Sequence, residues 1–233
     1  MKKKSTAASE RQPPWRFKLF PYLPIALTLL VFALIVFTLK TNATSEALYS
    51  LDNELMLSLA KLRTPGLNEI FIQLTALGSL TVMSLLTTVA TVLFWLGRDR
   101  LSAAHMLCAS IGAWVLIRVV KNIVGRERPT LIPRLVDVDG LSFPSGHSLA
   151  TAAIYGTLFF LTARHYPSHR AKSVLFLMCL CIALLVSFSR VYVGVHFPSD
   201  VTAGLSLGAA WACFLIIPSE TLKRKYGLTA KPR

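Results

Sequence analysis

The chain has 233 residues, of which 54% are hydrophobic and only 15% are charged, and its mean hydropathy is +0.57. Soluble domains carry about 25% charged residues, so this composition excludes a disordered chain and argues strongly against a soluble protein. The formal net charge is +14, which in a soluble protein would indicate nucleic-acid binding; here the charges must first be located relative to the apolar segments.

Six apolar segments follow one another along the chain. They are Leu23–Leu39, Ile70–Gly97, Leu101–Ile117, Leu149–Ala163, Val174–Ser189 and Val201–Pro218. A membrane-spanning helix needs about 20 apolar residues, which several segments reach only with small polar neighbours. None alternates with a period of two, as barrel strands do. The sequence therefore predicts an all-α integral membrane bundle of six transmembrane helices, within one domain over residues 21–218.

The segment Thr41–Glu69 separates the first two apolar segments and is mixed in character. Apolar residues recur in it at helical spacing, which predicts a short amphipathic helix on the outer surface. These residues are Ala47, Leu48, Leu51, Leu55 and Leu59. Gly78 divides the second apolar segment and predicts a break in that helix.

Six spans place both termini on one side of the membrane. That side holds sixteen of the 25 Lys and Arg residues but only three of the eleven acidic ones. Such an excess is typical of the cytoplasmic side, so the tails at residues 1–20 and 219–233 are predicted to be cytoplasmic, with Met1–Lys18 disordered. The net positive charge is then explained by the membrane topology and by attraction to anionic lipid head groups. Nucleic-acid binding is not needed to explain it.

Three cations lie at or near the predicted outer helix ends: Lys121, Arg128 and Arg190. A single cation there would be explained by snorkelling to the interface. Three on one side indicate a phosphate site, because Arg pairs with phosphate oxygens in a bidentate way and Lys adds a point charge.

Two predicted helix starts lie on the same outer side. Pro144-Ser145-Gly146-His147 precedes the fourth span, and its free N–H groups favour an anion that Gly146 allows to approach closely. His196 and Asp200 are four residues apart at the start of the sixth span, so both would lie on the same face if the chain is roughly helical there. The set fits phosphoryl transfer through a phosphohistidine, with His196 as nucleophile, Asp200 orienting it and His147 as general acid.

Other titratable residues have simpler interpretations. His105 is expected to be a packing residue, and His165 and His169 are expected to be solvated on the cytoplasmic side. No third outward-facing ligand completes a zinc site and no acidic pair resembles a magnesium site, so no metal and no cofactor are predicted. Arg126 is either an auxiliary cation or a surface residue.

The three outer segments together resemble the signature of the type 2 phosphatidic acid phosphatase superfamily, K-x6-RP, PSGH and SR-x5-H-x3-D. Lys121 to Arg128-Pro129 matches the first element, Pro144–His147 the second, and Ser189 to Asp200 the third. The resemblance implies that Lys121, Arg128, Ser145, Gly146 and Arg190 hold the phosphate, and that His147 activates the water that hydrolyses the phosphohistidine.

The likeness is greatest to small bacterial phosphatidylglycerophosphate phosphatases with six helices. It implies metal-independent hydrolysis of a lipid phosphate at the outer face of the bacterial inner membrane. The expected substrates are phosphatidylglycerophosphate, undecaprenyl pyrophosphate or both. A lipid A phosphatase and a lipid-to-lipid phosphotransferase stay open as alternatives. A vanadium haloperoxidase is disfavoured by the six spans, and a transporter by the absence of internal repeats and of midplane charges.

Overall fold

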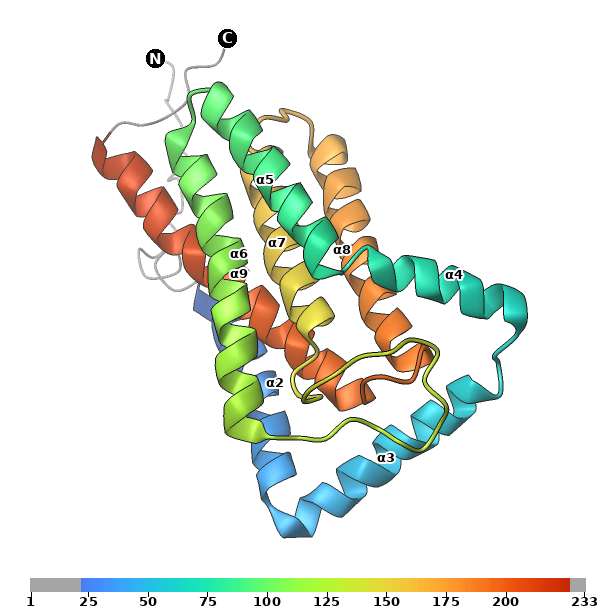
Figure 1. Ribbon diagram of the computed structural model, residues 1–233. Coiled ribbons are helices and arrows are strands. Elements are labelled where there is room, and N and C mark those ends of the chain that lie inside the picture. Colours follow the sequence, from blue (N-terminus) through green and yellow to red (C-terminus); the bar gives the residue numbers. More distant parts are fainter. Residues whose placement is uncertain (1–21, 227–233) are drawn as a thin grey trace, which may run out of the picture.

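The computed structural model describes residues 22–226, and within that range the chain forms eight α-helices and no strand (Figure 1). The helices are α2 (Tyr22–Lys40), α3 (Asn42–Ala60), α4 (Pro65–Ala76), α5 (Leu80–Leu96), α6 (Arg100–Val124), α7 (Gly146–Ala163), α8 (His169–Tyr192) and α9 (Pro198–Tyr226). The all-α prediction is confirmed for these residues. The predicted disordered tail, Met1–Lys18, lies outside them.

Four helices are long and apolar enough to cross a membrane: α2, α6, α8 and the Pro198–Ile216 part of α9. A fifth span results if α4 and α5 are taken together, with a bend of 44° between them. The break lies at the predicted position, since Gly78 falls between the two helices. By length and composition the structure therefore supports four or five spans, two or one fewer than the six that the sequence predicted.

The remaining predicted span is α7, an 18-residue helix that lies in the middle of the bundle. It packs against α5, α6, α8 and α9, and about half of its residues are buried, including Ser148, Thr151 and Thr157. A helix surrounded by other helices faces little lipid, so small and hydroxylated residues are tolerated at its contacts.

The contact between α7 and α9 depends on two glycines of α9. A Cβ atom at Gly208 would lie 2.3 Å from the carbonyl oxygen of Leu149, and one at Gly204 would lie 2.7 Å from that of Ser145. The G-x-x-x-G sequence Gly204–Gly208 thus packs within the bundle and brings the starts of both helices together.

The outer segment differs from the prediction of one short helix. It forms the 19-residue helix α3, which crosses one end of the bundle, and then α4, which leads back to α5 (Figure 1). Leu51 and Leu55 on α3 are half exposed, whereas Asp52 and Met56 are buried. The face with Asp52 and Met56 packs on the bundle, and the face with Leu51 and Leu55 does not. The helix, at 19 residues, is longer than the short helix that the apolar stripe predicted.

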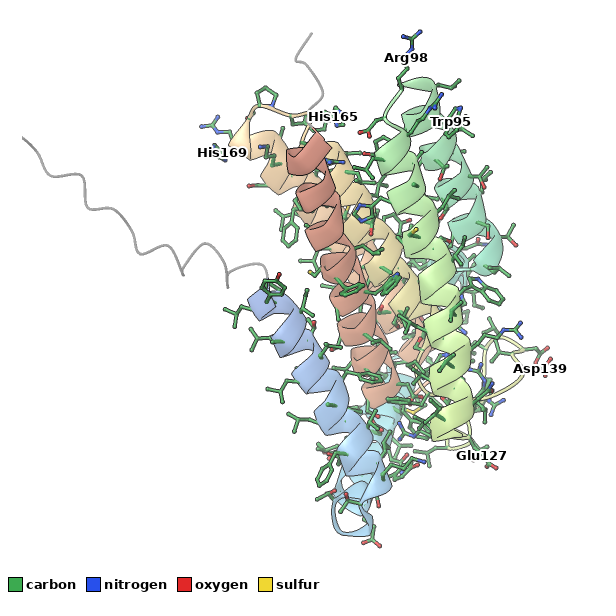
Figure 2. All side chains as sticks on the ribbon, turned by 90° about the vertical axis from the view of Figure 1, so that its left-hand side faces the viewer. Trp95, Arg98, Glu127, Asp139, His165 and His169 are labelled. Carbon is green, nitrogen blue, oxygen red and sulfur yellow. The ribbon has the colours of Figure 1, made fainter. Side chains whose placement is uncertain are left out.

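The two ends of the bundle carry different residues. Figure 2 shows Arg98, His165 and His169 at one end, and Glu127 and Asp139 at the opposite end. His165 and His169 therefore lie far from the segment that holds the predicted site. His105 lies within the bundle with its ring 6.0 Å from that of Phe160, as a packing residue would; neither ring nitrogen has a hydrogen-bond partner among residues 22–226.

Candidate active site

All eight predicted site residues gather at the end of the bundle that α3 crosses. Lys121 and Arg190 lie in the last turns of α6 and α8, and Asp200 lies in the first turn of α9. His196 lies between α8 and α9, and Arg128 lies in the segment between α6 and α7. Ser145, Gly146 and His147 form the start of α7.

The geometry around His196 defines its tautomer. Its Nε2 atom lies 3.2 Å from Nη1 of Arg128, and a guanidinium has only donors, so Nε2 is the unprotonated nitrogen. The proton is therefore assigned to Nδ1, which lies 3.2 Å from the hydroxyl oxygen of Ser142 and 3.6 Å from Oδ2 of Asp200. The lone pair of Nε2 points to the cationic side of the site.

Asp200 is fully buried and both of its oxygens are occupied. Oδ1 accepts from Arg126 at 2.6 Å, while Oδ2 accepts from the backbone N–H of Phe197 at 2.9 Å and from the hydroxyl of Ser142. The bond to Phe197, the residue before α9, is half of a capping box. Asp200 thus caps its own helix and faces His196 with the same oxygen.

Ser142 was missed by the sequence analysis because it precedes the PSGH element. Its hydroxyl donates to Asp200, which leaves its oxygen free to accept from Nδ1 of His196. The hydroxyl therefore links the two residues, whose direct distance of 3.6 Å is too long for a good hydrogen bond. Its position directly before the motif was the only available signal.

Burial controls the charge of His196. It lowers the pKa of the imidazole to about 3, although the bonded Asp200 acts in the opposite direction. The ring is therefore neutral at pH 7, and its Nε2 lone pair is available for attack.

The three cations of the site bond to backbone and hydroxyl oxygens. Arg128 donates to the carbonyl groups of Asp139, Gly140 and Val195 at 2.9–3.0 Å, and Lys121 donates to that of Leu141. Arg190, which is 3% exposed, donates to Thr75 on α4 at 2.6 Å. Its Nε has no partner among the described residues. Burial and the neighbouring Arg134 lower the pKa of Arg128.

The start of α7 is held close to these cations. His147 lies within electrostatic range of Arg190, His196, Arg128 and Lys121. Its ring packs on Gly78, where an added Cβ would lie 2.9 Å from the imidazole carbon Cδ2. Ser145 does not cap α7 with its side chain, which accepts from the hydroxyl of Ser148 at 3.0 Å. The first N–H groups of α7 are left without intrahelical acceptors, as at every helix start.

A cavity of about 440 Å³ opens beside His147 between α5, α6 and α7. Its wall is mainly apolar, with Met83, Trp114 and Ile154, and Lys121 lines it near His147. Leu80 and Trp114 belong both to this wall and to the exposed apolar surface of the helices. The cavity thus connects the polar site with the lateral surface of the bundle.

The burial of Arg126 excludes one of the two roles expected from the sequence. Arg126 is only 6% exposed, so the surface interpretation is wrong. Its donors bond to Asp52 of α3 at 2.8 Å and to Asp200 at 2.6 Å. Burial lowers the pKa of the guanidinium, but the two carboxylates outweigh it, so the net shift is upward. Asp52 was missed because no motif surrounds it.

Among residues 22–226 no group of three or more His, Cys, Asp or Glu side chains is arranged to hold a metal ion. The prediction of a metal-independent reaction therefore stays a prediction for experiment. The residues that are present offer mainly cationic and N–H donors, which suit an anion.

Comparison with known proteins agrees with this arrangement. The model of the PAP2 superfamily matches residues 102–223. Phosphatidylglycerophosphatase B of Bacillus subtilis is 32% identical over 188 residues, which cover 80% of this chain and 90% of that protein. An undecaprenyl-diphosphatase of Sulfolobus acidocaldarius is 33% identical over 57% of this chain and 62% of its own length. The crystal structure of a transmembrane PAP2-type phosphatidylglycerolphosphate phosphatase from Bacillus subtilis superposes with a TM-score of 0.79, at 30% identity over 87% of this chain and 98% of that one.

Proposed function

Because the chain belongs to the PAP2 superfamily and is a multi-pass membrane lipid phosphatase, we propose that it hydrolyses phosphatidylglycerophosphate through a phosphohistidine on His196. One observation carries this proposal. His196 directs an unprotonated Nε2 toward Arg128, while Asp200 and Ser142 lie at its Nδ1. A nucleophilic histidine needs this polarity, since positive charge develops on the ring as the nitrogen attacks.

The reaction has two steps. Nε2 of His196 attacks phosphorus, the bond from phosphorus to the lipid oxygen breaks, and His147 gives that oxygen a proton. Water then attacks the phosphohistidine, His147 takes a proton from the water, and the nitrogen–phosphorus bond breaks to release inorganic phosphate. In both steps Asp200, which is linked to Nδ1 of His196 through the hydroxyl of Ser142, stabilises the positive charge on the ring.

The phosphate is held by residues that supply only positive charge or N–H groups. Lys121, Arg128 and Arg190 act with their side chains, and the start of α7 at Ser145 and Gly146 acts with its backbone. Their charges compensate the oxygens of the phosphoryl group, on which negative charge is spread in the transition state.

A lipid substrate fits the cavity beside His147. Its apolar wall continues onto the exposed surface of α5 and α6, so an acyl chain can stay in the bilayer while the phosphate enters the polar end. The preference for phosphatidylglycerophosphate is supported by the relative that matches 80% of the chain. Undecaprenyl pyrophosphate is the second candidate, supported by the shorter match to an undecaprenyl-diphosphatase.

We also propose that both termini are cytoplasmic and that the site lies on the outer face of the bacterial inner membrane, because the excess of basic residues on the side of the termini is typical of the cytoplasmic side. In this arrangement α2, the α4–α5 pair, α6, α7, α8 and α9 form six spans, and α3 lies at the outer interface. Residues 21–218 then form one catalytic domain.

Phosphate release by the purified protein in detergent with excess EDTA tests this function. The four lipids are phosphatidylglycerophosphate, phosphatidic acid, undecaprenyl pyrophosphate and lipid A, with His196→Ala as the blank. Wild-type release that is fastest on phosphatidylglycerophosphate and absent in the variant supports the proposal. Release that stops with EDTA contradicts metal independence, and no release from any lipid contradicts hydrolysis.

A further inference from the structure

Arg126 lies between two carboxylates from distant parts of the chain. One end of the guanidinium, Nη2, contacts Asp52 at 2.8 Å, and the other, Nη1, contacts Asp200 at 2.6 Å. The rings of Tyr49 and Phe197 lie 4.5 and 4.0 Å from its central carbon. All three charged groups are at most 6% exposed, so little water screens their interactions.

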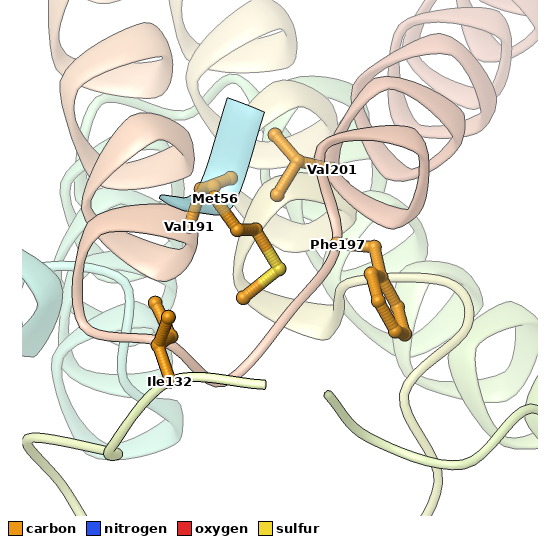
Figure 3. Packing of buried hydrophobic residues seen from close by; sticks show 5 residues of the cluster. All are labelled: Met56, Ile132, Val191, Phe197 and Val201. Atoms are coloured by element: carbon orange, nitrogen blue, oxygen red, sulfur yellow. The ribbon is translucent and has the colours of Figure 1, made fainter. Parts of the chain in front are cut away.

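Asp52 also holds the start of α9 directly. Its Oδ1 accepts from the backbone N–H of Ser199 at 2.9 Å, and its Oδ2 accepts from the hydroxyl of the same residue. One turn further along α3, Met56 is fully buried in a cluster formed by α3, α8, α9, the α8–α9 connection and the segment between α6 and α7 (Figure 3). The other members are Ile132, Val191, Phe197 and Val201. Asp52 therefore has little freedom to move away from Arg126.

The charge balance of this network matters for His196. Oδ1 of Asp200 accepts a hydrogen bond from Arg126. Its Oδ2 accepts one from Ser142 and faces Nδ1 of His196. If Arg126 had no other partner, its whole positive charge would be compensated by Asp200 alone. Asp52 compensates part of that charge, so a negative charge is left for the imidazolium that forms during the reaction.

We propose that Asp52 on α3 is a positioning residue for catalysis: it shares Arg126 with Asp200 and thereby fixes the carboxylate while leaving its charge available to His196. Helix α3 is then part of the active site, although it contributes no residue to the family signature. The inference rests on the proposed function, because the effect of Asp52 reaches the substrate through His196.

The network predicts that removing the charge of Arg126 and removing the charge of Asp52 shift the pH dependence of activity in opposite directions. Asp200 is faced by Arg126 and His196 at contact distance, and Lys121 and Arg128 act on it from further away. Removing the positive charge of Arg126 makes protonation of the His196–Asp200 pair easier, so activity is lost at a higher pH on the acid side. Removing the negative charge of Asp52 makes protonation harder, so the loss moves to a lower pH.

The experiment compares Asp52→Asn, Arg126→Gln and Glu54→Gln with wild type in detergent, using the lipid of the four that wild type hydrolyses fastest. Asp52→Asn keeps an oxygen for the N–H of Ser199, so the fold is expected to survive. For Asp52→Asn and Arg126→Gln we expect kcat to fall by roughly 10- to 100-fold with KM nearly unchanged. We also expect the acid limb of the pH–rate profile, the pH range in which activity is lost on acidification, to move to lower pH in Asp52→Asn and to higher pH in Arg126→Gln. Glu54 is exposed on the same helix, so Glu54→Gln removes the same charge and is expected to behave as wild type.

Acid limbs that move in the same direction, or not at all, overturn the proposal, as does an equal loss in Glu54→Gln. If Arg126→Gln is not recovered folded, Arg126→Lys replaces it, with an expected fall in kcat and an unshifted acid limb; unchanged kcat overturns the proposal. An inactive wild type would overturn the proposed function and this inference together. An active wild type with unaffected variants overturns the inference alone.

Discussion

Replacing Gly208 with alanine tests how closely α9 must approach α7 for the site to form. The added Cβ would lie 2.3 Å from the carbonyl oxygen of Leu149 and 2.9 Å from the Cβ of Ala152. Backbone cannot move aside as a flexible side chain does, so the two helices must separate. Leu149 lies one helical half-turn after His147, and any shift is carried to that imidazole.

The expected magnitude follows from the geometry. An ordinary contact needs at least 3.4 Å, so the helices must separate by roughly 1 Å, and overpacking of this kind costs about 1–3 kcal/mol. Alanine is favoured over glycine in a helix by about 1 kcal/mol, which leaves a net destabilisation of up to roughly 2 kcal/mol. A displacement of about 1 Å at a reacting group lowers the rate by as much as about 100-fold.

Gly66→Ala is the matched control, because a Cβ at that position in α4 meets nothing within 4 Å. The unfolding midpoint in detergent and kcat on the best lipid are measured for both variants. We expect Gly66→Ala to be as active as wild type and at least as stable, and Gly208→Ala to lose stability and rate. Equal behaviour of the two variants would refute the close packing of α7 on α9.

Three further predictions concern His196 and its partners. Asp200→Asn is expected to lower kcat by roughly three to four orders of magnitude, measured by phosphate release; a near-normal rate would leave Asp200 as a helix cap only. Ser142→Ala removes the hydroxyl between His196 and Asp200 and is expected to lower kcat by roughly 10- to 100-fold, the equivalent of about 1.5–3 kcal/mol for a hydrogen bond to a charged group; an unchanged kcat would show that the direct contact suffices. The pKa of His196 is lower in the folded protein than its ordinary value of 6.5, so the unfolded chain binds more protons and stability falls as the pH drops below about 6.5. Unfolding midpoints measured between pH 7 and pH 5 should fall less steeply in His196→Asn than in wild type, and parallel slopes would contradict the burial of a neutral ring.

The site residues were predictable because each stands in a short motif at a helix end. Lys121, Arg128, His147, Arg190 and Asp200 were identified from their positions near helix ends, their chemistry and the spacing of the motifs, and the structure brings all of them to one end of the bundle. Helix boundaries near the motifs followed from the same reasoning, since a helix start with free N–H groups is itself part of an anion site.

Asp52 was not predictable in the same way. It stands in no motif, and it lies between the leucines of the apolar stripe from which the outer amphipathic helix was predicted. In the structure Asp52 and Met56, four residues apart, form a second buried face against the bundle, while Leu51 and Leu55 stay half exposed. At a membrane interface a polar residue on an amphipathic helix can face either water or a polar protein site, and only the packing decides between them.

The number of spans shows a similar limit. Apolar length identifies helices that face lipid, such as α2, in which no residue is buried. It is a weaker guide to α7, which other helices surround and whose buried residues include Ser148 and Thr151.

The most direct test of the central claim is to look for the covalent intermediate. Wild type and Asp200→Asn are mixed with lipid carrying a labelled phosphate, quenched in alkali within the first turnover, and digested, and the labelled peptide is identified. The account predicts an acid-labile phosphate on the peptide that contains His196, and none in His196→Ala. A label on another residue, or turnover by His196→Ala, would contradict the assignment of His196 as the nucleophile.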